Sequence, residues 1–235
     1  MLNKLISILK KLLIFIKLNN SGIKGFFVKL FNFQKYFIVW RSIRFSDSVN
    51  YRLKPEPWFT YPTIEYLNNI KLLDLNVFEY GSGNGTKYFL ERGAKVTSVE
   101  DDKDWYDKIS LNKHKNHNYL FSKNQKEYVE RRELIDSEII IIDGSFRNRC
   151  TKYIISLFKT EKIDPAMIIF DNSDWYPNSL EILDKTFKWQ RVDFCGFGAV
   201  VPFTWVTSIY LNPNKVLKRV SKNLSSIGGV KHYLD

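Results

Sequence analysis

The sequence predicts an α/β protein with a doubly wound, seven-stranded sheet that ends in an antiparallel hairpin, preceded by a basic helical N-terminal extension. Short strand patterns alternate with helical ones, a glycine-rich turn follows the first strand pattern, and acidic residues follow several strands. The chain has 235 residues, of which 44% are hydrophobic and 26% are charged. These values are typical of one globular domain with an ordinary core plus an extension.

The strand patterns are short apolar runs bounded by polar or glycine-containing segments. They cover 77–80, 95–100, 117–122, 138–143, 166–171, 190–196 and 205–211. Helical patterns lie at 87–92, 103–111, 150–160 and 179–187. Since helices separate most of the earlier strands, those strands are expected to be parallel. The last two strands have no helix between them, which predicts the terminal antiparallel hairpin.

Basic charge is concentrated at the N-terminus. Residues 1–54 hold 11 of the 36 Lys and Arg residues but one of the 25 acidic residues, so the rest of the chain is nearly neutral. We therefore divide the chain into an extension, 1–45, and a main domain, 46–235. The only two cysteines, Cys150 and Cys195, indicate no disulfide framework, which fits a reducing compartment.

The extension begins with an amphipathic helix pattern over residues 1–18, with apolar residues on one face and lysines on the other. Its longest uncharged runs are five residues, whereas a membrane-spanning helix needs about 20 apolar residues. Lys10 and Lys11 also interrupt the apolar region that a signal peptide requires. With the aromatic and basic stretch at 25–41, the pattern favours a cytoplasmic protein held peripherally on the anionic inner face of the cell membrane. Packing on the main domain or on a second subunit is the alternative, and nucleic-acid binding is a weaker one.

The glycine-rich turn distinguishes between two classes of cofactor. A dinucleotide-binding turn has the spacing G-x-G-x-x-G, but here the glycines follow G-x-G-x-G and Thr86 stands at the last position. Glu79, two residues before the first glycine, would also repel a pyrophosphate. The pattern resembles motif I of the class I S-adenosylmethionine-dependent methyltransferases. The resemblance implies a Rossmann-like methyltransferase domain over 46–235, in which the turn wraps the methionine half of S-adenosylmethionine.

A second acidic residue supports this interpretation. Glu100 ends the second strand pattern, fifteen positions after Gly85, which leaves room for one helix and a return to the adjacent strand. A carboxylate at this strand end can accept hydrogen bonds from both ribose hydroxyls of the cofactor. The alternative is a tight glycine turn followed by a solvated strand end. The cofactor-binding residues implied by the resemblance are Glu79, Gly81, Ser82, Gly83, Gly85, Glu100 and Asp101.

Two further strands also end in acidic residues. Asp143 follows an isoleucine run, and Asp171 and Asn172 follow the next strand pattern, so adjacent parallel strands would bring the three together. Two carboxylates and an amide oxygen suit Mg²⁺. The set resembles that of the metal-dependent O-methyltransferases of the catechol and caffeoyl-CoA type, which implies that these residues bind the metal. The chain departs from the catechol type in having Arg147 and Arg149, rather than a lysine, after Asp143. Ordinary strand-end acids are the alternative.

The resemblance implies methyl transfer to an acceptor hydroxyl of a small molecule, and membrane recruitment suggests a glycan, a lipid-linked sugar or a lipid-like acceptor. Asp143 would hold the ion that lowers the pKa of the hydroxyl, and Asp174 or a metal-bound hydroxide would take its proton. Arg147 and Arg149 would bind an anionic group of the acceptor, or form a solvated basic loop. Trp58 and Tyr61 are candidates for a lid before the first strand. An RNA methyltransferase that uses the basic extension, and a non-catalytic cofactor-binding scaffold, are the alternatives.

Overall fold

The structure is a computed structural model that describes residues 42–43, 47–50, 53–110 and 114–220. Apart from residues 42 and 43, the predicted extension, 1–45, lies outside the described residues. The division of the chain at residue 45 therefore stays a prediction. Within the described part of the chain, none of the helices combines the length and apolarity that a membrane crossing requires.

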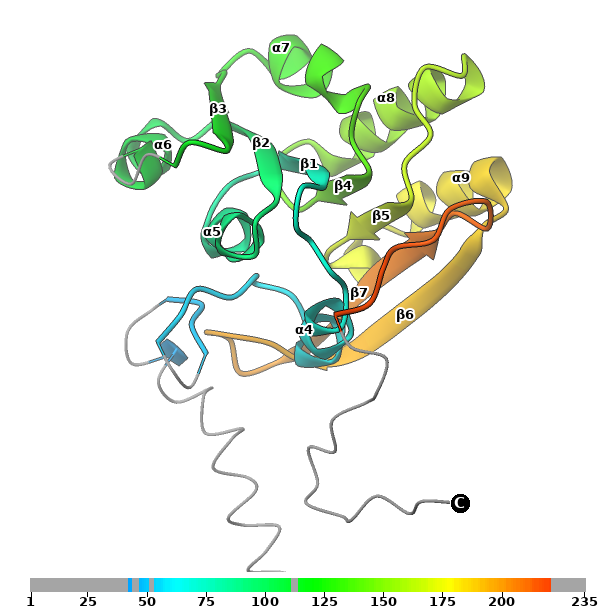
Figure 1. Cartoon of the computed structure of the whole chain (residues 1–235). Coiled ribbons are helices and arrows are strands. Elements are labelled where there is room, and N and C mark those ends of the chain that lie inside the picture. The colour runs from blue at the N-terminus through cyan, green and yellow to red at the C-terminus, as the bar shows by residue number, and fades with distance from the viewer. Residues whose placement is uncertain (1–41, 44–46, 51–52, 111–113, 221–235) are drawn as a thin grey trace, which may run out of the picture. The chain divides into compact units, whose positions relative to one another are not determined.

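Seven strands form one mixed sheet in the order β3-β2-β1-β4-β5-β7-β6 (Figure 1). The strands are β1 (Asn76–Tyr80), β2 (Lys95–Glu100), β3 (His117–Phe121), β4 (Ile139–Ile142), β5 (Met167–Phe170), β6 (Gln190–Phe197) and β7 (Thr204–Leu211). The first five are parallel, β7 runs antiparallel to β5, and β6 runs antiparallel to β7. This is the strand order of the Rossmann-like class I methyltransferase fold. The predicted fold class and its terminal hairpin are confirmed.

Helices cover both faces of the sheet (Figure 1). They are α4 (Tyr61–Asn68), α5 (Asn84–Glu91), α6 (Lys103–Ser110), α7 (Gln125–Val129), α8 (Arg147–Lys159) and α9 (Pro177–Phe187). On β4, Ile140 and Ile142 belong to the core cluster with α7, α8 and α9, whereas Ile139 and Ile141 belong to the cluster with α4 and α5. A strand buried on both faces explains the unbroken isoleucine run, because successive side chains alternate between faces.

Two helices begin three residues earlier than the sequence predicts, and both begin at the edge of the sheet where the parallel strands end. Asn84 rather than residue 87 opens α5, and Arg147 rather than residue 150 opens α8. The first turns are polar, so apolar periodicity does not reveal them. The residue before α8, Phe146, has a φ of 54°, in the left-handed region, which turns the chain sharply out of the strand-end loop. As a result, Arg147 begins its helix beside the end of β4.

Candidate functional site

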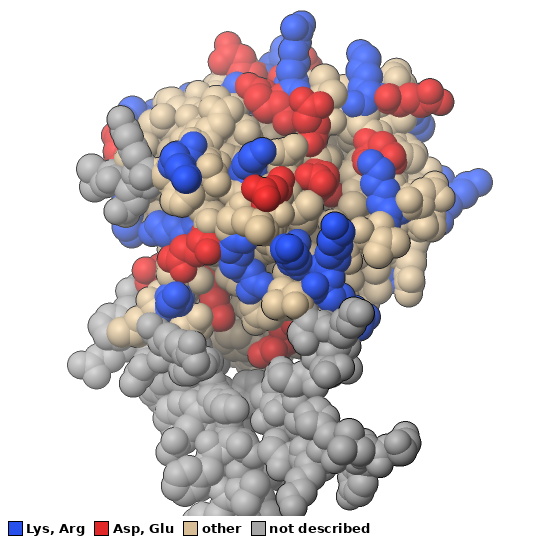
Figure 2. All heavy atoms as spheres, in the orientation of Figure 1, with Lys and Arg blue, Asp and Glu red and all other residues tan. Residues whose placement is uncertain are grey.

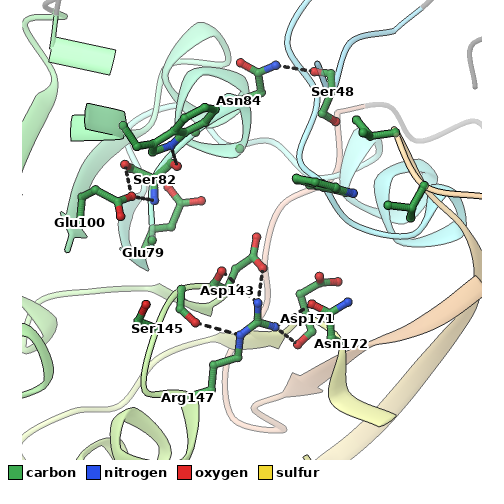
Figure 3. A pocket seen from close by; sticks show the side chains of 18 of the residues that line it. Ser48, Glu79, Ser82, Asn84, Glu100, Asp143, Ser145, Arg147, Asp171 and Asn172 are labelled. Carbon is green, nitrogen blue, oxygen red and sulfur yellow. Dashed lines mark hydrogen bonds and ion pairs between the residues drawn. The ribbon is translucent and has the colours of Figure 1, made fainter. Parts of the chain in front are cut away.

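A cavity of about 540 Å³ lies at the carboxyl ends of the parallel strands, where ligands bind in open α/β sheets. Its lining includes eleven of the predicted site residues: Glu79, Gly81, Ser82, Gly83, Gly85, Glu100, Asp101, Asp143, Arg147, Asp171 and Asn172. The loops after β1 and β2 form one half of the cavity, and the loops after β4 and β5 form the other (Figure 3). Asp174 is not part of the lining. Its Oδ1 accepts a hydrogen bond of 3.0 Å from the backbone N–H of Val206, at the far side of the loop.

Glu79 is a buried carboxyl group on β1 that faces the start of α5. It is 3% exposed, and its Oε2 accepts a hydrogen bond of 2.5 Å from Thr86 Oγ1. Burial raises the pKa of Glu79 to about 8; the hydrogen bond from Thr86 lowers it and nearby Glu100 raises it further. A Cβ on Gly85 would lie 2.8 Å from Glu79 Oε1, so glycine is needed there to admit the carboxyl group. Near neutral pH the side chain is therefore largely protonated.

Glu100 holds the glycine-rich turn in place. Its Oε2 accepts hydrogen bonds from the backbone N–H of Ser82, at 3.1 Å, and from Ser82 Oγ, at 2.8 Å. Its Oε1 accepts from the backbone N–H groups of Asp101, at 3.0 Å, and Asp102, at 3.1 Å. Burial raises the pKa of Glu100, although these hydrogen bonds act in the opposite direction. Since a carboxylate offers about four acceptor positions, any ribose hydroxyl would share them with these protein donors.

The glycines of the turn serve different purposes. Gly81 has a φ of 91°, in the region that favours glycine, and a Cβ there would lie 3.0 Å from Gly144 Cα. The close approaches at Gly81 and Gly85 are therefore to the protein itself. Gly83 differs, because a Cβ there would meet only the ring of Trp105, at 3.6 Å.

Aromatic residues that sequence reasoning largely missed complete the lining. Trp105 of α6 donates from Nε1 to the carbonyl of Ser82, at 2.5 Å. Trp58, Trp175 and Phe203 also line the cavity and are 48%, 55% and 47% exposed. Only Trp58 had been singled out, as a lid candidate, because nothing in the local pattern separates an aromatic at a cavity from one in the core. Tyr61, the other lid candidate, is not part of the lining.

Arg147 lies at the centre of the half formed by β4 and β5 (Figure 3). Its Nε donates to the carbonyl of Gly144, at 3.0 Å. Its Nη2 donates to the carbonyl of Asp143, at 3.2 Å, and to Asp143 Oδ1, at 3.1 Å. Its Nη1 donates to Asn172 Oδ1, at 2.9 Å, and to the carbonyl of Asp171. Because a guanidinium has five N–H donors, all of them have partners within the protein, and none is left to bind an anionic group of the acceptor as the sequence suggested.

The two aspartates of this half have different roles. Asp171 is buried, and its Oδ1 accepts from Trp205 Nε1, at 3.0 Å, and Thr207 Oγ1, at 2.5 Å. Burial raises the pKa of Asp171 to about 6, although these hydrogen bonds and the charge of Arg147 lower it. Burial and Asp171 raise the pKa of Asp143, and Arg147 lowers it. Only Oδ1 of Asp143 has a partner among the described residues, so Oδ2 is available at the cavity. Asp171 thus ties β5 to β7 through its Oδ1, and both aspartates line the cavity.

The predicted metal ligands do not fit a divalent ion as they are arranged. Asn172 Oδ1 is bound to Arg147, Oδ1 of Asp171 is bound to the side chains of β7, and a fixed positive charge lies between the strand ends. In the described part of the chain, no three His, Cys, Asp or Glu residues are grouped to hold a metal. The strand-end acids and the amide do meet as predicted, but they meet around an arginine.

Comparisons with known proteins give weak likenesses only. The sequence matches no protein-family model and no curated protein. Similar solved structures include a methyltransferase-like protein from Silicibacter pomeroyi, at 18% identity over 67% of this chain and 89% of that chain, with a TM-score of 0.39. They also include the N-methyltransferase NodS from Bradyrhizobium japonicum, solved with S-adenosyl-L-homocysteine, at 12% identity over 75% of this chain and 100% of that chain, with a TM-score of 0.44. A methyltransferase from Pyrococcus furiosus has 14% identity over 80% of this chain and 98% of that chain, with a TM-score of 0.43. At these values the fold rests on the strand order, and the chemistry rests on the residues of the cavity.

Proposed function

We propose that this chain is an S-adenosylmethionine-dependent methyltransferase that transfers a methyl group to an acceptor hydroxyl. One observation carries the proposal: Glu79 and Glu100 line one strand-end cavity, on either side of the glycine-rich turn, in a chain with the methyltransferase strand order. In this proposal Glu79 would contact the methionine half of the cofactor, and Glu100 would contact the ribose. Asp101 follows Glu100 at the rim, where the adenosine would lie.

The charge of the cavity supports a cationic ligand. Its lining contains six acidic residues, and within the described chain Arg147 is its only Lys or Arg. The donor would supply an activated methyl group on a positively charged sulfur. Acidic side chains stabilise the positive charges of this molecule by short-range attraction that a low-dielectric cavity strengthens. Because the pKa of Glu79 is raised, binding of the cation would favour loss of the proton from Glu79, and loss of that proton would strengthen binding of the cation.

The half formed by β4 and β5 supports proton removal from a hydroxyl. Asp143 Oδ2 faces the cavity, while Oδ1 is held by Arg147 at 3.1 Å. The raised pKa of Asp143 makes it a stronger base than an exposed aspartate, and Arg147 keeps it oriented. In this account Asp143 would accept the proton of the acceptor hydroxyl, and bound S-adenosylmethionine would supply the methyl group and leave as S-adenosylhomocysteine. Asp174, the proton acceptor suggested by the sequence, has the weaker position because it is bound to the backbone of β7.

The exposed aromatic side chains support an acceptor with an apolar face. Trp58, Trp175 and Phe203 line the cavity and remain about half exposed. Trp175 and Phe203 lie with ring centroids 6.3 Å apart. Aromatic rings at a site of this kind contribute contact area and packing against flat apolar surfaces. The C–H face of a sugar ring fits this lining, which favours a glycan or a lipid-linked sugar over a phosphate-rich acceptor.

We extend the proposal to location and partners. The extension, 1–45, would bind an anionic membrane surface on the cytoplasmic side and bring the domain to a lipid-linked acceptor. Basic and acidic side chains are interspersed on the face shown in Figure 2, which gives no support for a nucleic-acid track on that face. Binding of the full chain to vesicles with and without anionic lipid tests this part. Equal binding to neutral and anionic vesicles, or none to either, would contradict it.

The direct test uses a tritiated methyl donor with fractionated cell envelope and with total RNA. We expect label in a carbohydrate- or lipid-containing fraction, and loss of label with Asp143→Asn at unchanged donor binding. Arg149→Ala serves as the matched control, because Arg149 is exposed and does not line the cavity. Label in RNA would establish the RNA methyltransferase instead. Donor binding without transfer to any fraction would favour the non-catalytic scaffold.

A further inference from the structure

Arg147 donates hydrogen bonds to oxygens that the sequence suggested as metal ligands. Asp143 Oδ1 and Asn172 Oδ1 both accept from the guanidinium, together with the carbonyls of Asp143, Gly144 and Asp171. Two side-chain oxygens and three carbonyls converge on one positive group. Such a set of hard oxygens would suit a divalent cation if the guanidinium were absent.

The guanidinium is firmly fixed at this place. Its side chain is 12% exposed, its five N–H donors have five partners, and its charged group lies 5.5 Å from the ring centroid of Tyr176. Arginine does not lose its proton in proteins, so its positive charge persists at any working pH. A divalent ion bound by Asp143 Oδ1 and Asn172 Oδ1 would have to displace these contacts and approach a like charge, and both effects oppose binding.

We propose that Arg147 permanently takes the place of the divalent cation, so that this site assembles its acceptor half without a metal. The guanidinium joins the ends of β4 and β5, neutralises part of the charge of Asp143 and Asp171, and leaves Asp143 Oδ2 facing the cavity. Arg147 is thus a positioning residue rather than a group that binds the acceptor. The effect of Arg147 on catalysis rests on the proposed function, but the occupation of the cation position by Arg147 does not.

The test measures binding of Mn²⁺ to the full chain in the absence of donor and acceptor. Electron spin resonance detects the bound ion, and the melting temperature reports its effect on stability. In the wild type and in Arg149→Ala we expect that millimolar Mn²⁺ is not bound and does not change the melting temperature. Arg147→Ala should melt at a lower temperature without metal, bind about one Mn²⁺, and regain part of the loss when Mn²⁺ is added. Adding Asp143→Asn to Arg147→Ala should abolish this recovery.

Three results would overturn the proposal. The first is Mn²⁺ binding by the wild type that Asp143→Asn removes. The second is a folded Arg147→Ala protein that binds no Mn²⁺, because the remaining oxygens would then not form a cation site. If Arg147→Ala does not fold, Arg147→Lys replaces it. This variant keeps the positive charge and is expected to bind no Mn²⁺. Binding of Mn²⁺ by Arg147→Lys would be the third result against the proposal. Since these readouts need no methyl transfer, the proposal and the proposed function can fail separately.

Discussion

Gly81 and Gly144 are in backbone contact across the ends of β1 and β4. A Cβ on Gly144 would lie 2.5 Å from Gly81 N and 2.1 Å from the hydroxyl of Tyr128. Neither glycine therefore has room for a side chain. This contact fixes the turn that carries the cofactor half of the cavity against the loop that carries Asp143 and Arg147.

The contact predicts unequal costs for two glycine substitutions. Gly144→Ala should lower the free energy of unfolding by about 1–3 kcal/mol, the usual cost of overpacking, and weaken binding of S-adenosylmethionine. Gly83→Ala is the matched control, because its Cβ would make an ordinary contact of 3.6 Å with the ring of Trp105. Urea unfolding of both variants measures the difference. Equal stability of the two would mean that the loops are not held together as described.

The raised pKa of Glu79 predicts that ionisation of this residue destabilises the fold, although the proposed cation binding needs the ionised form. Its pKa is raised from 4.5 to about 8 in the folded chain, so folding is penalised increasingly as the pH rises through that range. Glu79→Gln, which resembles the protonated acid, should match the wild type near pH 5. At pH 9 it should be more stable by about 4–5 kcal/mol, since the pKa is raised by about 3.5 units and each unit corresponds to about 1.4 kcal/mol. Chemical unfolding at the two pH values tests this difference, and a variant less stable at pH 9 would refute the pKa assignment.

The ionisation of Glu79 also predicts that binding of S-adenosylmethionine depends on pH. If the bound cation favours ionised Glu79, binding below about pH 8 must release a proton, and the affinity should rise with pH and level off above pH 8. Calorimetry in two buffers of different ionisation enthalpy measures the proton release. In Glu79→Gln the release and the pH dependence should both disappear. Proton uptake by the wild type would contradict a cation next to Glu79.

Glu100 is expected to contribute to binding both directly and through the turn. Glu100→Ala should weaken S-adenosylmethionine binding at least tenfold, or about 1.4 kcal/mol, because it removes the proposed ribose acceptor and releases the Ser82 backbone. Ser82→Ala removes the hydroxyl contact of 2.8 Å but keeps the carboxylate, so its effect should be smaller. Calorimetric affinities for the two variants separate the roles. Equal losses would assign the effect of Glu100 to the turn alone.

The sequence predicts the sheet well because its strands have strong local signals. The isoleucines of β4 and the apolar run of β5 have the length and composition of buried strands, and their acidic ends meet at one edge because parallel strands end together. It predicts Arg147 poorly for a physical reason. The side chain reaches back from the first turn of α8 to five oxygens on two loops, and neither the early helix start nor the left-handed Phe146 has a local signature.

The same reasoning explains the metal prediction. Spacing along the chain brings Asp143, Asp171 and Asn172 together, but it does not reveal which cation they surround. The hydrogen bonds from Trp205 and Thr207 to Asp171 join residues more than thirty positions apart, so they too appear only in the folded chain.

The most direct measurement is a calorimetric titration of the full chain with S-adenosylmethionine. We expect one molecule bound per chain, in competition with S-adenosylhomocysteine, and weakened by Glu79→Gln and by Glu100→Ala. Absence of heat together with an unchanged melting temperature at millimolar donor would show that the strand-end cavity is not a site for this cofactor.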